Sequence, residues 1–338
     1  ADSETTPDGV GGVQIAQMGA LNSADAVTLS GSDLFANAGG VESVQIDSDG
    51  TTNQVTAAGN ILIQDGADAP GTADTIVNGR VETTGATTTI TVTGEEDVNF
   101  GSDGDLTTDG GTVTVTADTG TGNGAITMSD GAVINSDTGI IDIDAVGNIT
   151  LGRLVTTNGT ANAVNITTTM GGVIDGGDTG GEDIDADTSG ATTTISAATG
   201  IGGAAGVGGA GDNAIETDIP TNSGLIASVT GTGDIDIDET DTIELVDVDT
   251  ANGSIEVDAG STITATDVES TTDADGNDIV LDAATNDILV TRVNIGGGAT
   301  ASNGDVILEA GDEIALYGQG QWYCLSLPER GGQAPADL

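Results

Sequence analysis

One short segment of the chain combines the residue types that bind a hard cation. Residues 273–278 read Asp-Ala-Asp-Gly-Asn-Asp, which places three carboxylates and one amide around a glycine that suits a turn. Oxygen ligands at such short spacing are typical of Ca²⁺ sites, although the segment is shorter than an EF-hand loop and lacks the closing Glu of that motif. The sequence therefore makes Asp273, Asp275, Asn277 and Asp278 candidate metal ligands, with Ca²⁺ as a candidate cofactor that the fold does not require.

Other acidic residues alternate with isoleucine. In residues 234–238, which read Asp-Ile-Asp-Ile-Asp, the isoleucines face one side of a strand and the three aspartates face the other. The aspartates form either a solvated acidic face or a ladder of cation ligands, and the sequence leaves both interpretations open.

Catalytic chemistry has little support in this composition. The chain has no His, and its only basic residues are Arg80, Arg153, Arg292 and Arg330. No Ser-His-Asp or Cys-His arrangement can therefore form. Paired carboxylates could serve a glycosidase, but acidic pairs are so common here that they carry little information. We expect a non-enzymatic protein and keep a polysaccharide-active β-helix enzyme as an alternative.

Two threonine runs raise a different binding function. In residues 87–93 and 112–116 threonines alternate with Ile or Val, so several of them share one strand face. Flat threonine arrays on β-solenoids resemble ice-binding faces, whereas the ordinary interpretation is β-propensity on an exposed face. An ice- or carbohydrate-binding solenoid stays open as an alternative.

A spacing that recurs along the chain predicts the strands that must position these residues. Apolar or small residues follow one another in steps of 2, 2, 4, 2 and 3, and the pattern restarts every 20 to 27 residues. Steps of two predict short strands, and the breaks predict corners. Such units bury their apolar faces only by stacking, which predicts an all-β parallel β-helix, or β-solenoid, of roughly 15 coils over residues 1–316. Copies begin at Ile141, Ile235, Ile255, Ile279 and Val306, and we expect Ile255, Val257, Ile263, Ile279, Leu281 and Ile288 to stack inward.

Two segments depart from the repeat. The Gly-rich stretch near residues 200–213 is interpreted as a long corner loop, with a hinge between two rods as the alternative. Residues 317–338 hold three of the chain's five aromatic residues, Tyr317, Trp322 and Tyr323. Solenoid ends expose unpaired strand edges and usually carry a cap. We expect this segment to be either such a cap or a subunit-docking segment, with these aromatics as candidate interface residues.

The charge of the chain restricts its partners. The formal net charge is −51, which argues against nucleic acid and anionic lipid, because both need a basic surface. The same charge makes the rod repel itself, so salt or bound cations should relieve the repulsion. No stretch approaches the ~20 apolar residues of a membrane span, and the single Cys324 excludes an internal disulfide framework.

The repeat phrases are similar to those of a known family. Gly253-Ser-Ile-Glu-Val-Asp-Ala-Gly260, Gly147-Asn-Ile-Thr-Leu151 and Gly304-Asp-Val-Ile-Leu-Glu-Ala-Gly311 resemble the repeats of filamentous-haemagglutinin-type exoproteins. That family comprises large secreted bacterial adhesins and related surface fibres. The resemblance covers residues 40–316 and is strongest after 230. It implies a right-handed parallel β-helix and an extracellular structural or adhesive role.

These observations converge on one expectation about function. We expect a non-enzymatic subunit of a bacterial surface fibre, with a host or surface glycan as a candidate partner and copies of the chain joined end to end in a filament. Because the chain starts at Ala1 without Met, we expect it to reach the cell surface or the exterior through a removed signal peptide.

Overall fold

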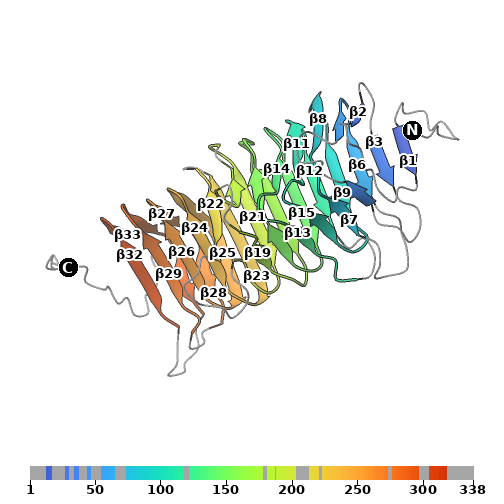
Figure 1. The fold of residues 1–338 in the computed structure, drawn as a ribbon. Coiled ribbons are helices and arrows are strands. Elements are labelled where there is room, and N and C mark those ends of the chain that lie inside the picture. The colour runs from blue at the N-terminus through green and yellow to red at the C-terminus, as the bar shows by residue number, and fades with distance from the viewer. Residues whose placement is uncertain are drawn as a thin grey trace, which may run out of the picture.

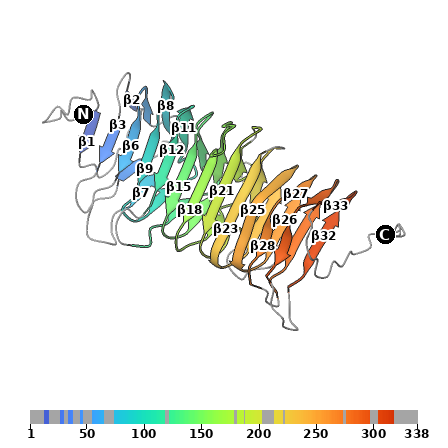
Figure 2. The ribbon, with the colours of Figure 1, turned by 180° about the vertical axis from the view of Figure 1, so that it is seen from behind.

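The chain folds into an elongated stack of parallel strands (Figure 1; Figure 2 gives the view from behind). The computed structural model describes the backbone of four early strands, β1 to β4, and then residues 55–64, 74–117, 122–177, 181–186, 188–202, 213–220, 223–272, 276–296 and 304–317. Within these residues the regular elements are all strands, and every strand pairing that joins neighbouring coils is parallel. The predicted all-β parallel β-helix is therefore confirmed.

The strands form three sheets that run along the rod. The largest has 15 strands: β1 (Val13–Ala16), β3 (Leu34–Asn37), β6 (Ile61–Gln64), β9 (Ile90–Thr93), β12 (Val113–Thr116), β15 (Ile141–Ala145), β18 (Val164–Thr168), β21 (Thr192–Ala197), β23 (Gly224–Thr232), β25 (Ile243–Asn252), β27 (Ile263–Ala265), β28 (Val268–Ser270), β30 (Ile288–Val290), β31 (Val293–Ile295) and β33 (Ile314–Leu316).

The other two sheets cover the remaining sides of the coil. The 12-stranded sheet contains β2 (Val27–Leu29), β5 (Val55–Ala57), β8 (Val81–Ala86), β11 (Leu106–Asp109), β14 (Val133–Asn135), β17 (Arg153–Val155), β20 (Ile184–Asp185), β22 (Ile215–Asp218), β24 (Ile235–Glu239), β26 (Ile255–Ala259), β29 (Ile279–Ala283) and β32 (Val306–Ala310). The 6-stranded sheet contains β4 (Val44–Ile46), β7 (Thr75–Val77), β10 (Val98–Phe100), β13 (Ile126–Met128), β16 (Ile149–Leu151) and β19 (Val173–Asp175).

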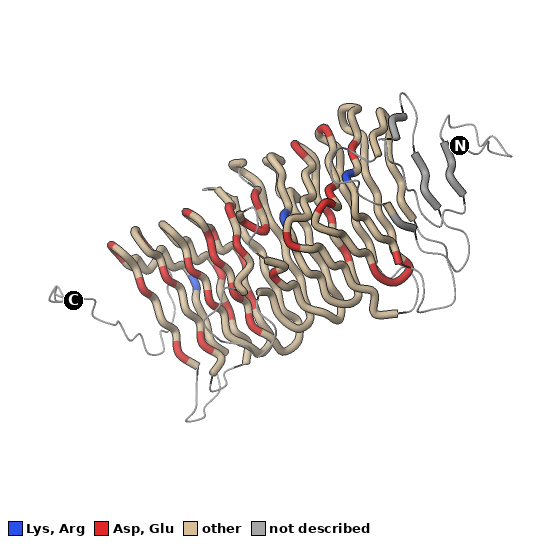
Figure 3. The backbone as a smooth tube through the Cα atoms, in the orientation of Figure 1, with Lys and Arg blue, Asp and Glu red and all other residues tan. Residues whose placement is uncertain are grey.

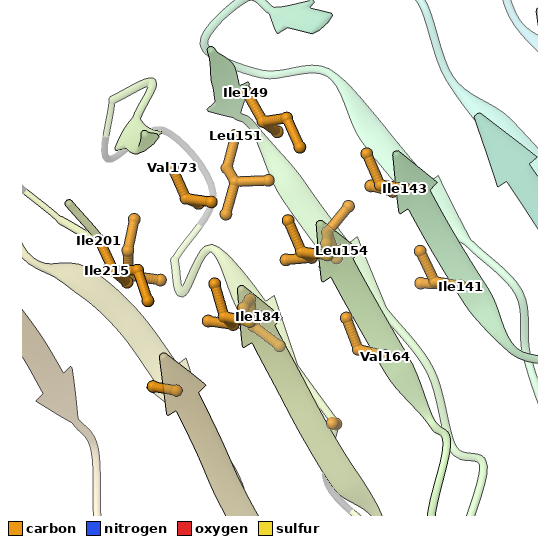
Figure 4. Close-up of a cluster of buried hydrophobic side chains, with 14 of the residues drawn as sticks. Ile141, Ile143, Ile149, Leu151, Leu154, Val164, Val173, Ile184, Ile201 and Ile215 are labelled. Carbon is orange, nitrogen blue, oxygen red and sulfur yellow. The ribbon is translucent and has the colours of Figure 1, made fainter. Parts of the chain in front are cut away.

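The core is a set of columns in which each coil places a similar side chain on the one below. Ile255 pairs in register with Ile279, and Val257 pairs with Leu281. The six residues expected to stack inward, Ile255, Val257, Ile263, Ile279, Leu281 and Ile288, are all 0% exposed. Figure 4 shows the same arrangement in the middle of the rod, where Ile, Leu and Val side chains from successive coils fill the interior. Because the interior is narrow, β-branched and small side chains fill it.

The repeated spacing does not mark the same side of the coil throughout. Residues 141–145 lie in β15 of the 15-stranded sheet, whereas residues 255–259, which have the same spacing, lie in β26 of the 12-stranded sheet. The 6-stranded sheet ends at β19, and only Ile201 extends it, by single bridges to Val173 and Ile235. Beyond that point β25 splits the sheet: residues 243–245 pair with β27, which leads to β30 and β33, while residues 248–250 pair with β28. The third side of the coil thus changes position along the rod.

The 15-stranded and 12-stranded sheets continue past the Gly-rich stretch near residues 200–213. On either side of it, β21 pairs with β23 over six residues, and β20 pairs with β22. Ile184 and Thr217 are partners 33 residues apart, while Ile235 and Ile255 are only 20 apart. Each coil contributes one strand to the 12-stranded sheet, so the structure has about twelve coils. The sequence predicted roughly 15, because it assumed about 22 residues per coil and several coils are longer.

Buried hydroxyl groups satisfy the backbone at the corners. Ser136 Oγ donates to the carbonyl of Gly139 at 2.9 Å, and Thr156 Oγ1 of the next coil donates to the same carbonyl at 2.8 Å. A Cβ atom on Gly139 would lie 2.0 Å from the carbonyl oxygen of Gly111 in the coil below, so only glycine fits between the two corners. Thr250 and Ser270 repeat the hydroxyl contact on the carbonyls of Gly233 and Gly253.

The core columns predict a large cost for a truncated inward side chain. We expect Ile143→Ala to lower the free energy of unfolding by about 2–5 kcal/mol, because Ile143 is fully buried and the coils on both sides hold the cavity open. Urea denaturation followed by circular dichroism measures the change. The outward Thr150→Ala in β16 serves as the control and should change stability by no more than about 0.5 kcal/mol. Equal effects from the two variants would contradict the assignment of the core.

Candidate functional site

The structure describes two of the four predicted calcium ligands and gives them bonds between coils. Asn277 is 8% exposed, and its Nδ2 donates to Asn252 Oδ1 at 2.9 Å and to the carbonyl of Thr272 at 2.7 Å. Asp278 Oδ1 accepts a hydrogen bond from the backbone N–H of Asp305 at 2.8 Å. The other two candidates, Asp273 and Asp275, lie outside the described residues. Calcium binding by residues 273–278 stays a prediction.

The predicted interface segment is described only at its start. Tyr317 is 69% exposed at the end of the rod, and its backbone N–H donates to the carbonyl of Val290 at 2.8 Å. Trp322 and Tyr323 lie outside the described residues. The structure therefore places one of the three candidate interface residues beside the last strand, β33.

The outward aspartates of β24 belong to a longer acidic ladder. Asp238 pairs in register with Asp258, then Asp282, then Glu309 on successive strands of the 12-stranded sheet. Adjacent strands lie about 4.8 Å apart, so like charges stand directly beside one another, and Figure 3 shows acidic residues following neighbouring coils in this part of the rod. Burial, followed by the charges of Glu256 and Asp238, raises the pKa of Asp236 to about 6.

The threonine runs form an array that extends over two adjacent coils. Thr91 pairs with Thr114 on the adjacent coil, but the next residue in that column is Asp142. The column from Thr93 meets Asp144 in the same way, through Thr116. Carboxylates therefore interrupt the threonine surface after two coils.

The three described arginines are engaged with carboxylates. Arg153 contacts Asp185 of the next coil at 2.8 Å, and Arg292 contacts both Asp267 and Glu269 of the preceding coil. Arg80 lies 3.7 Å from Glu82. In this part of the chain the guanidinium groups neutralise the protein's own acidic residues.

A hollow on the 12-stranded sheet is lined only by residues with polar side chains. It lies over β8, β11 and β14 and is lined by Glu82, Thr83, Thr84, Thr107, Thr108, Asp109, Asn135 and Asp137. Its hydroxyl, amide and carboxyl groups could hydrogen-bond to a sugar, but its lining contains no basic or aromatic side chain.

One buried carboxyl group stands at an inward position of the repeat. Glu239 is 4% exposed and pairs in register with Ala259, a small core residue. Its carboxylate accepts hydrogen bonds from Thr217 Oγ1 at 2.8 Å and from the backbone N–H of Ile219 at 3.2 Å. Burial raises its pKa to about 8 despite these bonds, with a smaller contribution from the charge of Asp241.

The sequence alone did not predict the two carboxylate clusters that the structure brings together, each of which contains one buried acid. Two sets of three carboxylates have oxygen atoms within 4.8 Å of one another: Asp175, Asp183 and Glu216, and also Asp218, Glu239 and Asp241. The repeat places Glu239 at a position where the other copies have alanine, so the sequence alone could have identified it as a buried carboxyl group. No local pattern signals the first set, because Glu216 follows Asp183 by 33 residues and joins it only through the pairing of β20 with β22.

Comparison of the chain with protein-family models, with curated proteins and with solved structures finds no match. The described residues include no helix with the length and apolar character needed to cross a membrane.

Glu239 predicts an unusual loss of stability as pH rises. The folded protein keeps the proton of Glu239 up to about pH 8, whereas the unfolded chain releases it near 4.5. Stability therefore falls as pH rises through this window, by an amount on the order of a few kcal/mol, since each unit of pKa shift corresponds to ~1.4 kcal/mol. We expect Glu239→Gln to melt at a higher temperature than the wild type at pH 8 and to show a smaller decrease between pH 5 and 8.

The measurement is a series of thermal melts at constant ionic strength with a chelator present. Glu244→Gln is the matched control, because it removes a carboxylate that points outward from β25. Asp218 and Asp241, which each have a carboxylate oxygen within 4.8 Å of one of Glu239, remain in both variants. Identical pH profiles for the wild type and Glu239→Gln would show that Glu239 does not retain its proton.

Proposed function

We propose that this protein is a non-enzymatic, extracellular structural or adhesive solenoid, a subunit of a bacterial surface fibre whose copies join end to end. The observation that supports the proposal most strongly is an exposed apolar side chain at the last described strand, β33. Ile288 and Val290 in β30 are 0% exposed because β33 stacks on them, whereas Leu316 of β33, the partner of Val290, is 44% exposed.

The geometry of parallel sheets favours a second copy of the chain as the partner that binds to β33. The 15-stranded sheet begins at β1 and ends at β33, so its two terminal strands each have a paired neighbour on one side only among the described strands. A terminal strand presents unpaired N–H and C=O groups that another strand can bond. A head-to-tail contact between opposite ends does not close on itself and therefore produces a filament.

Charge and sequence support the extracellular, structural part of the proposal. The net charge of −51 suits a saline exterior and opposes assembly at low salt, because the acidic surfaces repel. The repeat phrases resemble those of secreted bacterial surface fibres. A host or surface glycan is the proposed ligand, and the polar hollow over β8, β11 and β14 offers groups that can bond to sugar hydroxyls.

Filament formation is tested by electron microscopy of the purified chain over a range of concentration at about 0.15 M salt, where the Debye length falls to ~8 Å. We expect end-to-end filaments one solenoid wide. Leu316→Glu should abolish them, because a charge at the terminal strand prevents apolar stacking. Met170→Glu is the matched control: Met170 is also a large exposed hydrophobic residue, at 63%, but it lies between β18 and β19 in the middle of the rod.

Deletion of residues 317–338 separates a docking segment from a cap. A folded but monomeric product supports docking on a neighbouring subunit, whereas unfolding or unaltered polymerisation counts against it. Isolated rods of the wild type at every concentration and salt level would contradict the fibre proposal.

A further inference from the structure

Three carboxylates from three different strands or their ends meet beside the 12-stranded sheet. Asp175 ends β19, Asp183 directly precedes β20, and Glu216 lies in β22. Since Ile184 pairs with Thr217, Asp183 stands next to Glu216 of the following coil. One carboxylate oxygen from each of the three residues lies within 4.8 Å of the other two.

Asp183 is buried in this group with an oxygen that lacks a donor. The residue is 2% exposed, and its Oδ2 atom has no hydrogen-bond partner among the described residues. The backbone N–H of Glu216 bonds to the same carboxyl group, and the side chain of Glu216 lies within hydrogen-bonding reach. Two carboxylates in contact supply only acceptors, so a proton or a cation must lie between them.

The charges around Asp183 make the group costly without a counterion. Burial raises the pKa of Asp183 far above its usual range, and the charges of Asp175 and Glu216 add to this effect. The nearest described arginine along the sheet, Arg153, is bonded to Asp185 at 2.8 Å. A buried set of carboxylates is stable when a positive charge is bound among them.

We propose that Asp175, Asp183 and Glu216 bind one Ca²⁺ ion, which joins adjacent coils of the solenoid at this corner. Ca²⁺ takes oxygen ligands at 2.3–2.6 Å, so two oxygens on a common ion lie no more than about 5 Å apart, in agreement with the separation of these three atoms. Mg²⁺ requires shorter bonds and stricter octahedral geometry, and Zn²⁺ prefers nitrogen and sulfur ligands. The site is separate from the predicted loop at residues 273–278.

A second cluster of three carboxylates in the same sheet region differs from the proposed calcium site in its hydrogen bonding. Asp218, Glu239 and Asp241 are equally close together, but the carboxylate of Glu239 already accepts bonds from Thr217 and Ile219. That set has no buried oxygen without a donor among the described residues, and it carries no metal proposal.

The position of the ion explains what it would stabilise. Strand β20 has only two residues, and it pairs with β17 and with β22 through two residues each. Most other strand pairs in the sheets join through three to six residues. The ion lies beside one of the shortest strand pairings between coils and near the point where the 6-stranded sheet ends, so it adds carboxylate–cation contacts where few backbone hydrogen bonds join this side of the coils.

The test is calorimetric titration of the chelator-treated full chain with CaCl₂ in about 0.15 M NaCl, which screens weak binding along the acidic ladder. We expect one saturable site with a dissociation constant below about 1 mM and a higher melting temperature with Ca²⁺ than with chelator. Asp183→Asn should weaken this site at least about tenfold, because it removes the central charged ligand. Asp144→Asn, which removes an outward carboxylate from β15, should leave the site unchanged.

Two results would overturn the proposal. One is a wild-type titration without a saturable site up to about 10 mM calcium, which would mean that a proton, not a cation, holds the carboxyl groups together. The other is unchanged calcium affinity in Asp183→Asn. If that variant does not fold, the same titration of Asp175→Asn decides: weakened binding supports the site, and unchanged binding overturns it.

Discussion

Register between coils is the constraint on which this structure depends. Parallel hydrogen bonding stacks each residue on the residue at the same position of the next coil, about 4.8 Å away. A column of Ile255, Ile279 and Val306 therefore extends a core without any large side chain. The same rule stacks corner glycines, because a Cβ on Gly253 would lie 2.0 Å from the carbonyl oxygen of Gly233 in the coil below. The apolar core and the glycine corners therefore both result from the pairing of equivalent residues on adjacent coils.

The rule that stacks isoleucines also stacks carboxylates, and burial decides the consequence. Where the ladder of Asp238, Asp258 and Asp282 faces solvent, water and salt screen the repulsion. Where the buried Asp183 lies beside Asp175 and Glu216, solvent screens the repulsion much less. The acidic residues therefore cost little free energy on most of the surface. At a few buried positions a proton or a cation must balance the charge.

The sequence predicted local structure well and relative position poorly. Steps of two residues identify strands and inward faces, so Ile263 and Leu281 were placed correctly in the core. The side of the coil to which a strand belongs depends on corner and loop lengths, which period-two patterns do not encode. Residues 141–145 and 255–259 therefore share a spacing but lie in different sheets. The buried carboxylate group was invisible for the same reason: Asp183 and Glu216 become neighbours only through a register that spans a long loop. Glu239 was detectable, because it replaces an alanine in the repeat.

When each coil is held only by pairing with the coils beside it, nothing in the repeat limits the number of coils. Each coil buries the one before it, so the last coil always leaves an apolar layer and a strand edge that an added element must cover. At the described end, Leu316 continues the column of Val290, and Tyr317 still bonds to the coil below through its backbone. A second copy that presents its first strands in the same register would bury this layer in the way that every internal coil already does. Assembly into a fibre would then extend the contact that folds the subunit, and the acidic surface would set the salt concentration at which that contact outweighs repulsion.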